Sequence, residues 1–174
     1  MNTTPAPHIP LVSNETQTHV TLTAQSPWPG LAAYDERASD FFFGRKEEAA
    51  ERARMIRLAP LTVLYGKSGL GKTSLLQAGL YPLLRAEHYF PVHLRLDFSS
   101  SAILAPLDQA MQKLLQAFAG AGVEFSPAAA GESLWHYLHR RDLEIWNQDN
   151  YPLTPVLIFD QFEEIFSQGE WNPE

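Results

Sequence analysis

The sequence predicts an α/β fold in which a parallel β-sheet lies between two layers of helices. Three observations predict it. An apolar run at 61–65 passes into a glycine-rich loop and then a helix-forming segment. A segment with alternating polarity follows at 90–98, and a second apolar run at 155–160 ends in an aspartate. A strand and two helices are predicted between the two apolar runs, as in a sheet of crossover units.

The glycine-rich segment is a phosphate-binding loop of the Walker A type. Residues Gly66–Thr73 have the sequence GKSGLGKT, which matches the pattern G-x-x-x-x-G-K-[ST]. Leu61–Tyr65 is predicted to be a short buried parallel strand, and Ser74–Ala78 begins a helix. This order of strand, loop and helix is the context that the motif requires.

The chemistry of the loop follows from its residue types. Glycines at 66, 69 and 71 let the backbone approach a ligand closely, so that successive N–H groups can surround phosphate. Lys72 is predicted to reach the β- and γ-phosphates and to serve catalysis, and the Thr73 hydroxyl to bind Mg²⁺. The predicted nucleotide-binding residues here are Gly66, Lys67, Ser68, Gly69, Leu70, Gly71, Lys72, Thr73 and Ser74.

Composition narrows the class of protein. The chain has 174 residues, a net charge of −7 and no cysteine, so it has no disulfide framework and no thiolate metal site. The negative charge argues against a broad nucleic-acid surface. No run approaches the roughly 18 apolar residues of a membrane span, and the N-terminus lacks the plan of a signal peptide. A cytoplasmic protein is expected.

The chain divides into a flexible leader at 1–25 and one domain at 26–174. The leader is rich in Thr, Pro, Asn and Gln, although 19–23 could form an edge strand. Two prolines keep 26–31 extended, and the phenylalanines before Gly44 indicate an anchored turn. A helix is predicted from Lys46 to Leu58, with acidic residues in its first turn.

The middle of the chain is predicted to alternate between helices and strands. The helix from Lys72 should stop near Gly79, because Pro82 cannot donate to the preceding turn, and a short helix should follow at 82–86. After the strand at 90–98, serines at 99–101 are expected to cap a helix that runs to about Ala119. Its core positions are predicted to be Leu107, Met111, Leu114 and Phe118.

The segment before the second apolar run is predicted to form a loop, a helix and a turn. The loop covers 120–131 and is rich in glycine and alanine. The helix covers 132–146, and the turn covers 147–152. His136 and His139 lie three residues apart on this helix, but no third metal ligand is evident nearby.

The second site element is the run at 155–160, which ends in Asp160. An aspartate at the carboxyl end of a buried parallel strand lies where such sheets bind ligands, and there it would hold Mg²⁺, as a Walker B acid does. The alternative is a helix N-cap, and both roles can coexist. Glu163 and Glu164 are candidate catalytic acids that could orient or deprotonate water; alternatively they are solvated acids in the first turn of the next helix.

Three segments together resemble the novel STAND NTPases, a prokaryotic branch of the signal-transduction ATPases with numerous domains. They are WPGL at 28–31 leading into FFGRKEE at 42–48, the loop at 66–73, and VLIFDQFEEI at 156–165. The resemblance covers about 26–168. It implies the P-loop NTPase three-layer sandwich of the ASCE/STAND type, with ATP and Mg²⁺ as cofactors.

The resemblance also implies residue roles. Gly44, Arg45 and Glu48 would seat adenine, while Asp160 would be the Mg²⁺ acid beside Thr73. The related NACHT pattern has a small residue after this aspartate, where this chain has Gln161. That difference leaves open which of the two following glutamates faces the water.

The resemblance implies a sheet with the strand order 5-1-4-3-2, in which a strand later than 155–160 separates it from 61–65. That strand, a helical lid, a winged helix and C-terminal repeats or a propeller would lie beyond residue 174, so we expect a domain that is incomplete at its C-terminus. The isolated chain is expected to be at best a weak ATPase of low stability, because unpaired strand edges expose backbone groups.

The expected function is an ATP-binding and hydrolysing switch module of a signal-transduction or defence protein, with nucleotide-dependent self-association left open. Two other functions use the same loop: a phosphotransferase, which would need an acceptor site, and a non-catalytic nucleotide-binding adaptor. ATP is expected rather than GTP, because no guanine-reading N-K-x-D pattern occurs in the sequence.

Overall fold

The computed structural model describes residues 22–99 and 101–167. The predicted leader and the 19–23 strand therefore fall mostly outside the described residues. The elements are η1 (Glu36–Phe41), α1 (Lys46–Leu58), α2 (Lys72–Ser74), η2 (Leu75–Leu80), α3 (Tyr81–Ala86), β1 (Tyr89–Arg95), α4 (Pro106–Gly120), β2 (Glu124–Phe125), α5 (Leu134–Leu138), β3 (Ile145–Trp146), β4 (Thr154–Asp160) and α6 (Glu164–Ser167).

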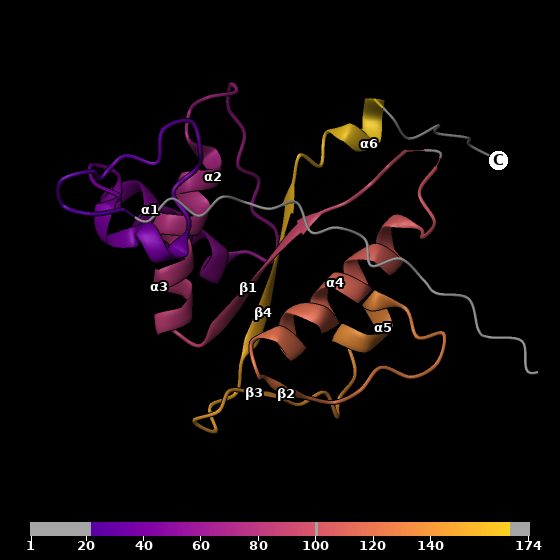
Figure 1. The fold of residues 1–174 in the computed structure, drawn as a ribbon. Coiled ribbons are helices and arrows are strands. Elements are labelled where there is room, and N and C mark those ends of the chain that lie inside the picture. The colour runs from indigo at the N-terminus through magenta and orange to yellow at the C-terminus, as the bar shows by residue number, and fades with distance from the viewer. Residues whose placement is uncertain (1–21, 100, 168–174) are drawn as a thin grey trace, which may run out of the picture.

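The centre of the fold is a parallel pair of strands, β1 and β4. They pair in register from Tyr89 opposite Thr154 to Arg95 opposite Asp160. Helices α1, α2 and α3 lie on one side of this pair, and α4 and α5 lie on the other (Figure 1). The α/β class and the parallel pairing are thus confirmed, and the pairing matches the neighbours 3 and 2 of the predicted strand order.

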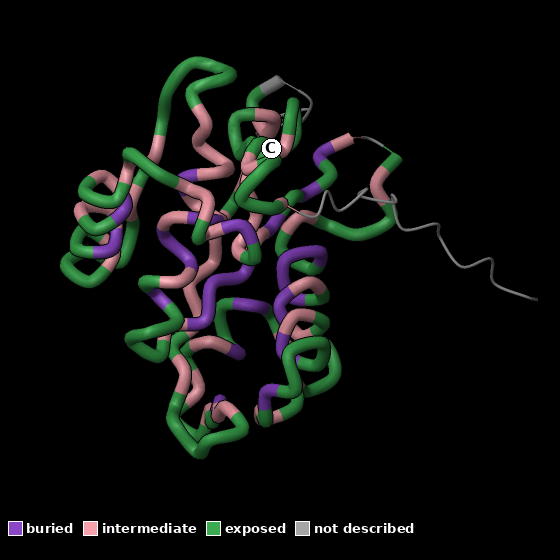
Figure 2. The backbone as a smooth tube through the Cα atoms, turned by 60° about the vertical axis from the view of Figure 1, so that its left-hand side comes forward, coloured by how far each residue is buried: buried purple, intermediate pink, exposed green. Residues whose placement is uncertain are grey.

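The alternation of side chains along β1 builds a hydrophobic core on each face of the sheet. Phe90, Val92 and Leu94 join the larger cluster, which includes the inner residues of α4 and α5. The smaller cluster on the opposite face is formed by Ala53, Leu80 and Leu84 from α1, η2 and α3. Buried positions accordingly concentrate along β1 and on the surfaces of the helices packed against the sheet, whereas the residues of β4 are intermediate or exposed (Figure 2).

The helix after the phosphate loop continues to Ala86 instead of stopping near Gly79. Pro82 is accommodated by the π-helical turn η2, in which the N–H of Tyr81 donates to Leu76 O, five residues earlier. Gly79 is needed for packing, since a Cβ there would lie 3.1 Å from Ala49 Cβ. The predicted stop was wrong, because the π-helical turn changes the hydrogen-bond spacing and the helix continues through Pro82, which has no N–H to donate.

Helix α4 begins later than predicted, at Pro106, with extended Ala105 before it as the geometry of proline favours. The loop ahead of α4 is held by buried Gln109, which accepts from the Asp97 N–H and donates to the Asp97 and Leu104 carbonyls. These side-chain bonds, rather than a serine cap, satisfy the backbone there.

Only part of the predicted core face of α4 is buried. Met111, Leu114 and Phe118 are at most 9% exposed, whereas Leu107 is 62% exposed. The first turn of α4 therefore projects beyond the layer that covers β1, and the prediction for Leu107 was wrong.

The predicted helix at 132–146 is limited to α5, and its last residues form β3. Strand β3 pairs antiparallel with β2, which lies inside the predicted loop at 120–131. The predicted turn that follows is present, closed by Asn147 Oδ1, which accepts from the N–H groups of Asp149 and Tyr151.

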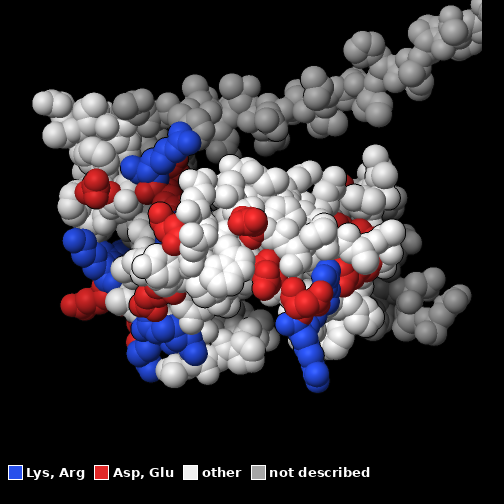
Figure 3. Space-filling view, turned by 90° about the horizontal axis from the view of Figure 1, so that it is seen from below, with Lys and Arg blue, Asp and Glu red and all other residues white. Residues whose placement is uncertain are grey.

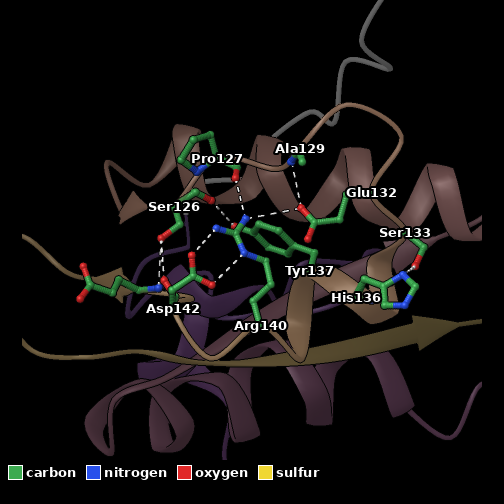
Figure 4. Close-up of polar contacts among 10 residues, drawn as sticks. Ser126, Pro127, Ala129, Glu132, Ser133, His136, Tyr137, Arg140 and Asp142 are labelled. Carbon is green, nitrogen blue, oxygen red and sulfur yellow. Dashed lines mark hydrogen bonds and ion pairs between the residues drawn. The ribbon is translucent and has the colours of Figure 1, made fainter.

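Arg140 explains why α5 is short (Figure 4). Its guanidinium donates to Pro127 O at 2.9 Å and to both oxygens of Asp142 at 3.2 and 2.9 Å. The hydroxyl of buried Tyr137 donates to Ser126 O at 2.8 Å. The bonds to Ser126 and Pro127 join residues 11 and 13 positions apart and fold the chain back on itself, so tertiary contacts override helix propensity at 139–146.

The segment at 61–65 does not form the predicted strand. No strand pairing involves it within the described residues. Leu61, Val63 and Tyr65 are 78%, 73% and 89% exposed. An extended segment becomes a strand only through hydrogen bonds to a neighbour, and the described chain brings none to this segment.

Candidate functional site

The phosphate loop lies at the end of the molecule where β4 finishes. In Figure 1 the loop ahead of α2 and the helix α6 are both at the upper end, on either side of the carboxyl end of β4. This is the edge at which open parallel sheets bind ligands.

The glycines of the loop differ in backbone conformation. Gly69 and Gly71 have φ angles of +81° and +71°, which side chains rarely adopt. Gly66 has no positive φ, and a Cβ there would make a close contact of 3.3 Å with Cδ1 of the exposed Leu70 side chain. The predicted backbone freedom therefore applies to two of the three glycines.

Lys72 occupies the interior of the loop. Its ammonium donates to Gly66 O at 2.9 Å and to Lys67 O at 3.1 Å. Lys72 is also the first residue of α2, directly after left-handed Gly71. The positive charge of Lys72 therefore lies against the loop backbone at the start of a helix. Helix N-termini are sites at which proteins bind anions.

Arg45 joins helix α1 to the phosphate loop. Its Nε and Nη2 donate to the two carboxylate oxygens of Glu48 at 2.8 and 2.7 Å. Its Nη1 donates to Leu70 O at 2.9 Å and to Gly71 O at 3.3 Å. Gly44, with φ +83°, makes the left-handed turn that directs Arg45 there. The structure thus brings Arg45 to the loop, with Glu48 bonded to it and Gly44 directly before it in the chain.

The Arg45–Glu48 pair is a charge-assisted, two-bonded contact of the strong kind. The hydrogen bond from Arg45 lowers the pKa of Glu48, against a smaller opposing effect of burial. The same bond raises the pKa of Arg45. Glu48 therefore stays ionised and keeps the guanidinium in place against the loop.

The Ser74 hydroxyl accepts a hydrogen bond from the Tyr34 N–H at 3.1 Å, so it is directed toward Tyr34 rather than toward the loop. Tyr34 in turn donates from its own hydroxyl to Pro27 O at 3.0 Å. The rigid aromatic segment predicted at 26–31 is thus attached through Tyr34 to the helix after the loop, and the Ser74 side chain provides that attachment.

Asp160 lies at the end of β4, as predicted, and contacts residues that the sequence analysis missed. Its Oδ2 is 3.2 Å from Nε2 of His93 on β1. His93 Nδ1 is 3.1 Å from the amide nitrogen of Gln77 on η2. The sequence contained a signal for this contact, since His93 and Arg95 alternate with apolar residues in the strand. Polar groups in a strand that is covered on both faces need hydrogen-bonding partners.

The residue after Asp160 is in an unusual conformation. Gln161 has φ +54°, a left-handed conformation favourable to glycine and costly for other residues. The ring of Phe162 lies across those of Phe98 and Phe159, at 6.0 and 5.6 Å between centroids.

The two candidate catalytic glutamates differ in their surroundings. Glu164 Oε1 accepts from Arg95 Nη2 at 2.6 Å, which ties α6 to the end of β1. The side chain of Glu163 is exposed and has no hydrogen bond or ion pair among the described residues. The sequence does not distinguish these two acids, but the structure does.

One more polar group lies buried near this region. The Tyr81 hydroxyl, on the first residue of α3, has no hydrogen-bond partner within the described ranges. Burial raises its pKa most, and the negative charges of Asp160 and Glu36 raise it further. The phenol is therefore a neutral neighbour of the Asp160 carboxylate.

The residues present fit a nucleotide with Mg²⁺. Hydroxyl and carboxylate oxygens, such as those of Thr73 and Asp160, are the hard ligands that Mg²⁺ prefers. The left-handed glycines at 69 and 71 match a loop whose backbone approaches its ligand closely. The first observation concerns the chemical type of the ligand atoms and the second concerns the shape of the loop, and neither depends on a bound ligand.

The remaining surface and the helices give two further observations. On the face shown in Figure 3, Lys and Arg side chains lie beside Asp and Glu rather than gathering in one basic patch. Among the described residues, every helix is too short or too polar to cross a membrane.

Comparison with known proteins places the chain in a family. No curated protein and no solved structure matches it. The family model described as novel STAND NTPase 1 matches residues 27–174, which is most of the chain and includes the loop, the Arg45–Glu48 pair and Asp160. The chain therefore belongs to the novel STAND NTPase 1 family.

Proposed function

We propose that the chain is the ATP- and Mg²⁺-binding part of a switch NTPase. The observation that carries the proposal is the loop at 66–73. There, two left-handed glycines bend the backbone into a ring at the start of a helix. The Lys72 ammonium, at 2.9 Å from Gly66 O, adds a positive charge to this ring. On phosphate binding, Lys72 would exchange its carbonyl partners for phosphate oxygens, which are stronger acceptors.

Each group of residues in the site would have a separate role in binding the nucleotide. Backbone N–H groups from Gly66 to Ser74 would surround the phosphates, and Arg45 would hold the loop in shape from α1. Thr73 and Asp160 would hold Mg²⁺, which neutralises phosphate charge when bound. Gly44, Arg45 and Glu48 would border the adenine, since Arg45 contacts the loop at Leu70 and Gly71 and Glu48 holds Arg45 there.

Nucleotide exchange or hydrolysis would then change how neighbouring domains pack, as in other nucleotide switches. We propose that those partners are C-terminal domains outside this sequence and that the protein works in the cytoplasm. The exposed apolar row Leu61, Val63 and Tyr65 supports packing against further structure.

Calorimetric titration of the chain with ATP and with GTP, each with Mg²⁺ and with EDTA, tests the proposal. We expect ATP to bind, more tightly with Mg²⁺ than with EDTA, and GTP to bind more weakly. An absence of ATP binding by folded protein would contradict the proposal. Phosphate transfer to an added acceptor would favour a phosphotransferase, and binding without any turnover would favour an adaptor.

The catalytic acid can be assigned by a matched pair of variants. We expect Glu163→Gln to lower ATP turnover by about 10²–10⁴-fold, the usual contribution of a general base. Glu164→Gln should have the smaller effect, because Arg95 holds that carboxylate at 2.6 Å. The readout is phosphate release under single-turnover conditions.

Glu124→Gln is the control for this comparison, because Glu124 lies on β2, at the opposite end of the molecule from α6 (Figure 1). If Glu164→Gln has the larger effect, the acid is Glu164 and its contact with Arg95 must open on nucleotide binding.

A further inference from the structure

Three polar side chains from three different elements form one chain of hydrogen bonds behind the phosphate loop. Gln77 on η2 contacts His93 on β1 at 3.1 Å, and His93 contacts Asp160 on β4 at 3.2 Å. The side chains of His93 and Asp160 are only 27% and 28% exposed. Partly buried polar groups are usually kept where they have partners and a task.

The chemistry of the partners sets the direction of these bonds. The amide nitrogen of Gln77 can only donate, so its contact with His93 has Nδ1 as the acceptor. With the ring proton on Nε2, His93 donates to Asp160 Oδ2. One oxygen of the carboxylate is thereby held by the ring, and the other oxygen remains for a different ligand.

The chain of bonds also reaches the helix that carries the other proposed Mg²⁺ ligand. Gln77 follows Thr73 by four residues on the continuous helix after the loop, and residues so spaced lie on the same side of a helix. The helix that carries Thr73 and the strand that ends in Asp160 are therefore joined by the contacts of Gln77 and His93. A movement of the helix relative to β4 would change these bonds.

We infer that His93, held by Gln77, is a positioning residue that orients the Asp160 carboxylate toward a divalent cation beside the phosphate loop. The inference rests on the proposed binding of Mg²⁺ and ATP. Partners that hydrogen-bond to metal-ligating carboxylates typically change metal affinity or activity about 10- to 100-fold when they are replaced. His93 touches neither phosphate nor cation in this arrangement and acts through Asp160.

The test compares His93→Leu with His93→Gln in the full chain. The probes are ATP with Mg²⁺ and ATP with EDTA, and the measured quantity is the ratio of the two dissociation constants. His93→Leu should reduce the gain in ATP affinity that Mg²⁺ provides by about 10- to 100-fold, and it should leave the dissociation constant for ATP in EDTA unchanged. His93→Gln keeps an N–H donor and should restore most of the gain.

His139→Leu is the matched control, because His139 follows α5 on the other side of the sheet and stacks on exposed Trp135. It should leave both dissociation constants unchanged. Gln77→Leu provides a second variant in case His93→Leu does not fold, as judged by thermal unfolding. It should reduce the Mg²⁺-dependent gain in the same direction.

The outcomes separate this inference from the proposed function. If the wild-type chain binds ATP equally well with Mg²⁺ and with EDTA, the proposed Mg²⁺ site is wrong and the inference fails with it. If the wild type shows the gain and both His93→Leu and Gln77→Leu keep it, the inference alone is wrong. Equal losses with Mg²⁺ and with EDTA would also overturn it, since they would indicate a merely structural role.

Discussion

Lys72→Ala is expected to remove most of the affinity for ATP. The ammonium is the charge at the centre of the loop, and hydrogen bonds to charged groups are worth about 1.5–3 kcal/mol each. Such a loss weakens binding about 10- to 150-fold. The fold should persist, because the two bonds that the ammonium makes go to Gly66 and Lys67 carbonyls at an exposed loop. Calorimetric titration with Mg²⁺ and ATP gives the change.

Lys113→Ala is the control, since it removes the same charge from α4, on the other side of the sheet. Its ATP affinity should equal that of the wild-type chain. Unchanged affinity in the Lys72 variant, with a normal thermal transition, would mean that the loop at 66–73 is not the nucleotide site.

Leu114→Ala is expected to be strongly destabilising. Leu114 is fully buried in the larger core cluster. Replacing buried leucine by alanine typically costs about 2–5 kcal/mol, because apolar burial is lost and a cavity remains. That is a large part of the roughly 5–15 kcal/mol by which ordinary domains are stable. Urea unfolding followed by circular dichroism measures the change.

Leu107→Ala is the matched control on the same helix, one heptad earlier. Leu107 is 62% exposed, so its replacement should change the free energy of unfolding by no more than about 0.5 kcal/mol. Similar losses in both variants would show that the first turn of α4 is covered in solution.

Short-range patterns predicted the parts of the fold that depend on local chemistry. Helix α1 has the predicted bounds, and the alternating and apolar runs form β1 and β4. Gly69 and Gly71 adopt the left-handed conformation that their place in the loop motif suggests. In each case the residues involved are close in sequence, so pattern and spacing contain the needed information.

Errors arose where contacts between distant residues decided the conformation. The run at 61–65 has strand-forming residues but no hydrogen-bonded neighbour in the described chain. The helix predicted through Trp146 ends early, because Arg140 binds Pro127 O, 13 residues earlier in the chain. The error at Pro82 had a local cause, since a π-helical turn lets the helix continue through the proline.

The sequence by itself determined the family features of this protein: a Walker A loop, an acid at the end of an apolar strand and the Arg45–Glu48 spacing. Only the tertiary structure decided that Arg45 binds the loop carbonyls, that Arg95 holds Glu164, and that His93 joins Gln77 to Asp160. The physical reason is that a motif specifies the local backbone and its chemistry. The partner of a polar side chain, by contrast, depends on which elements the packed sheet brings together.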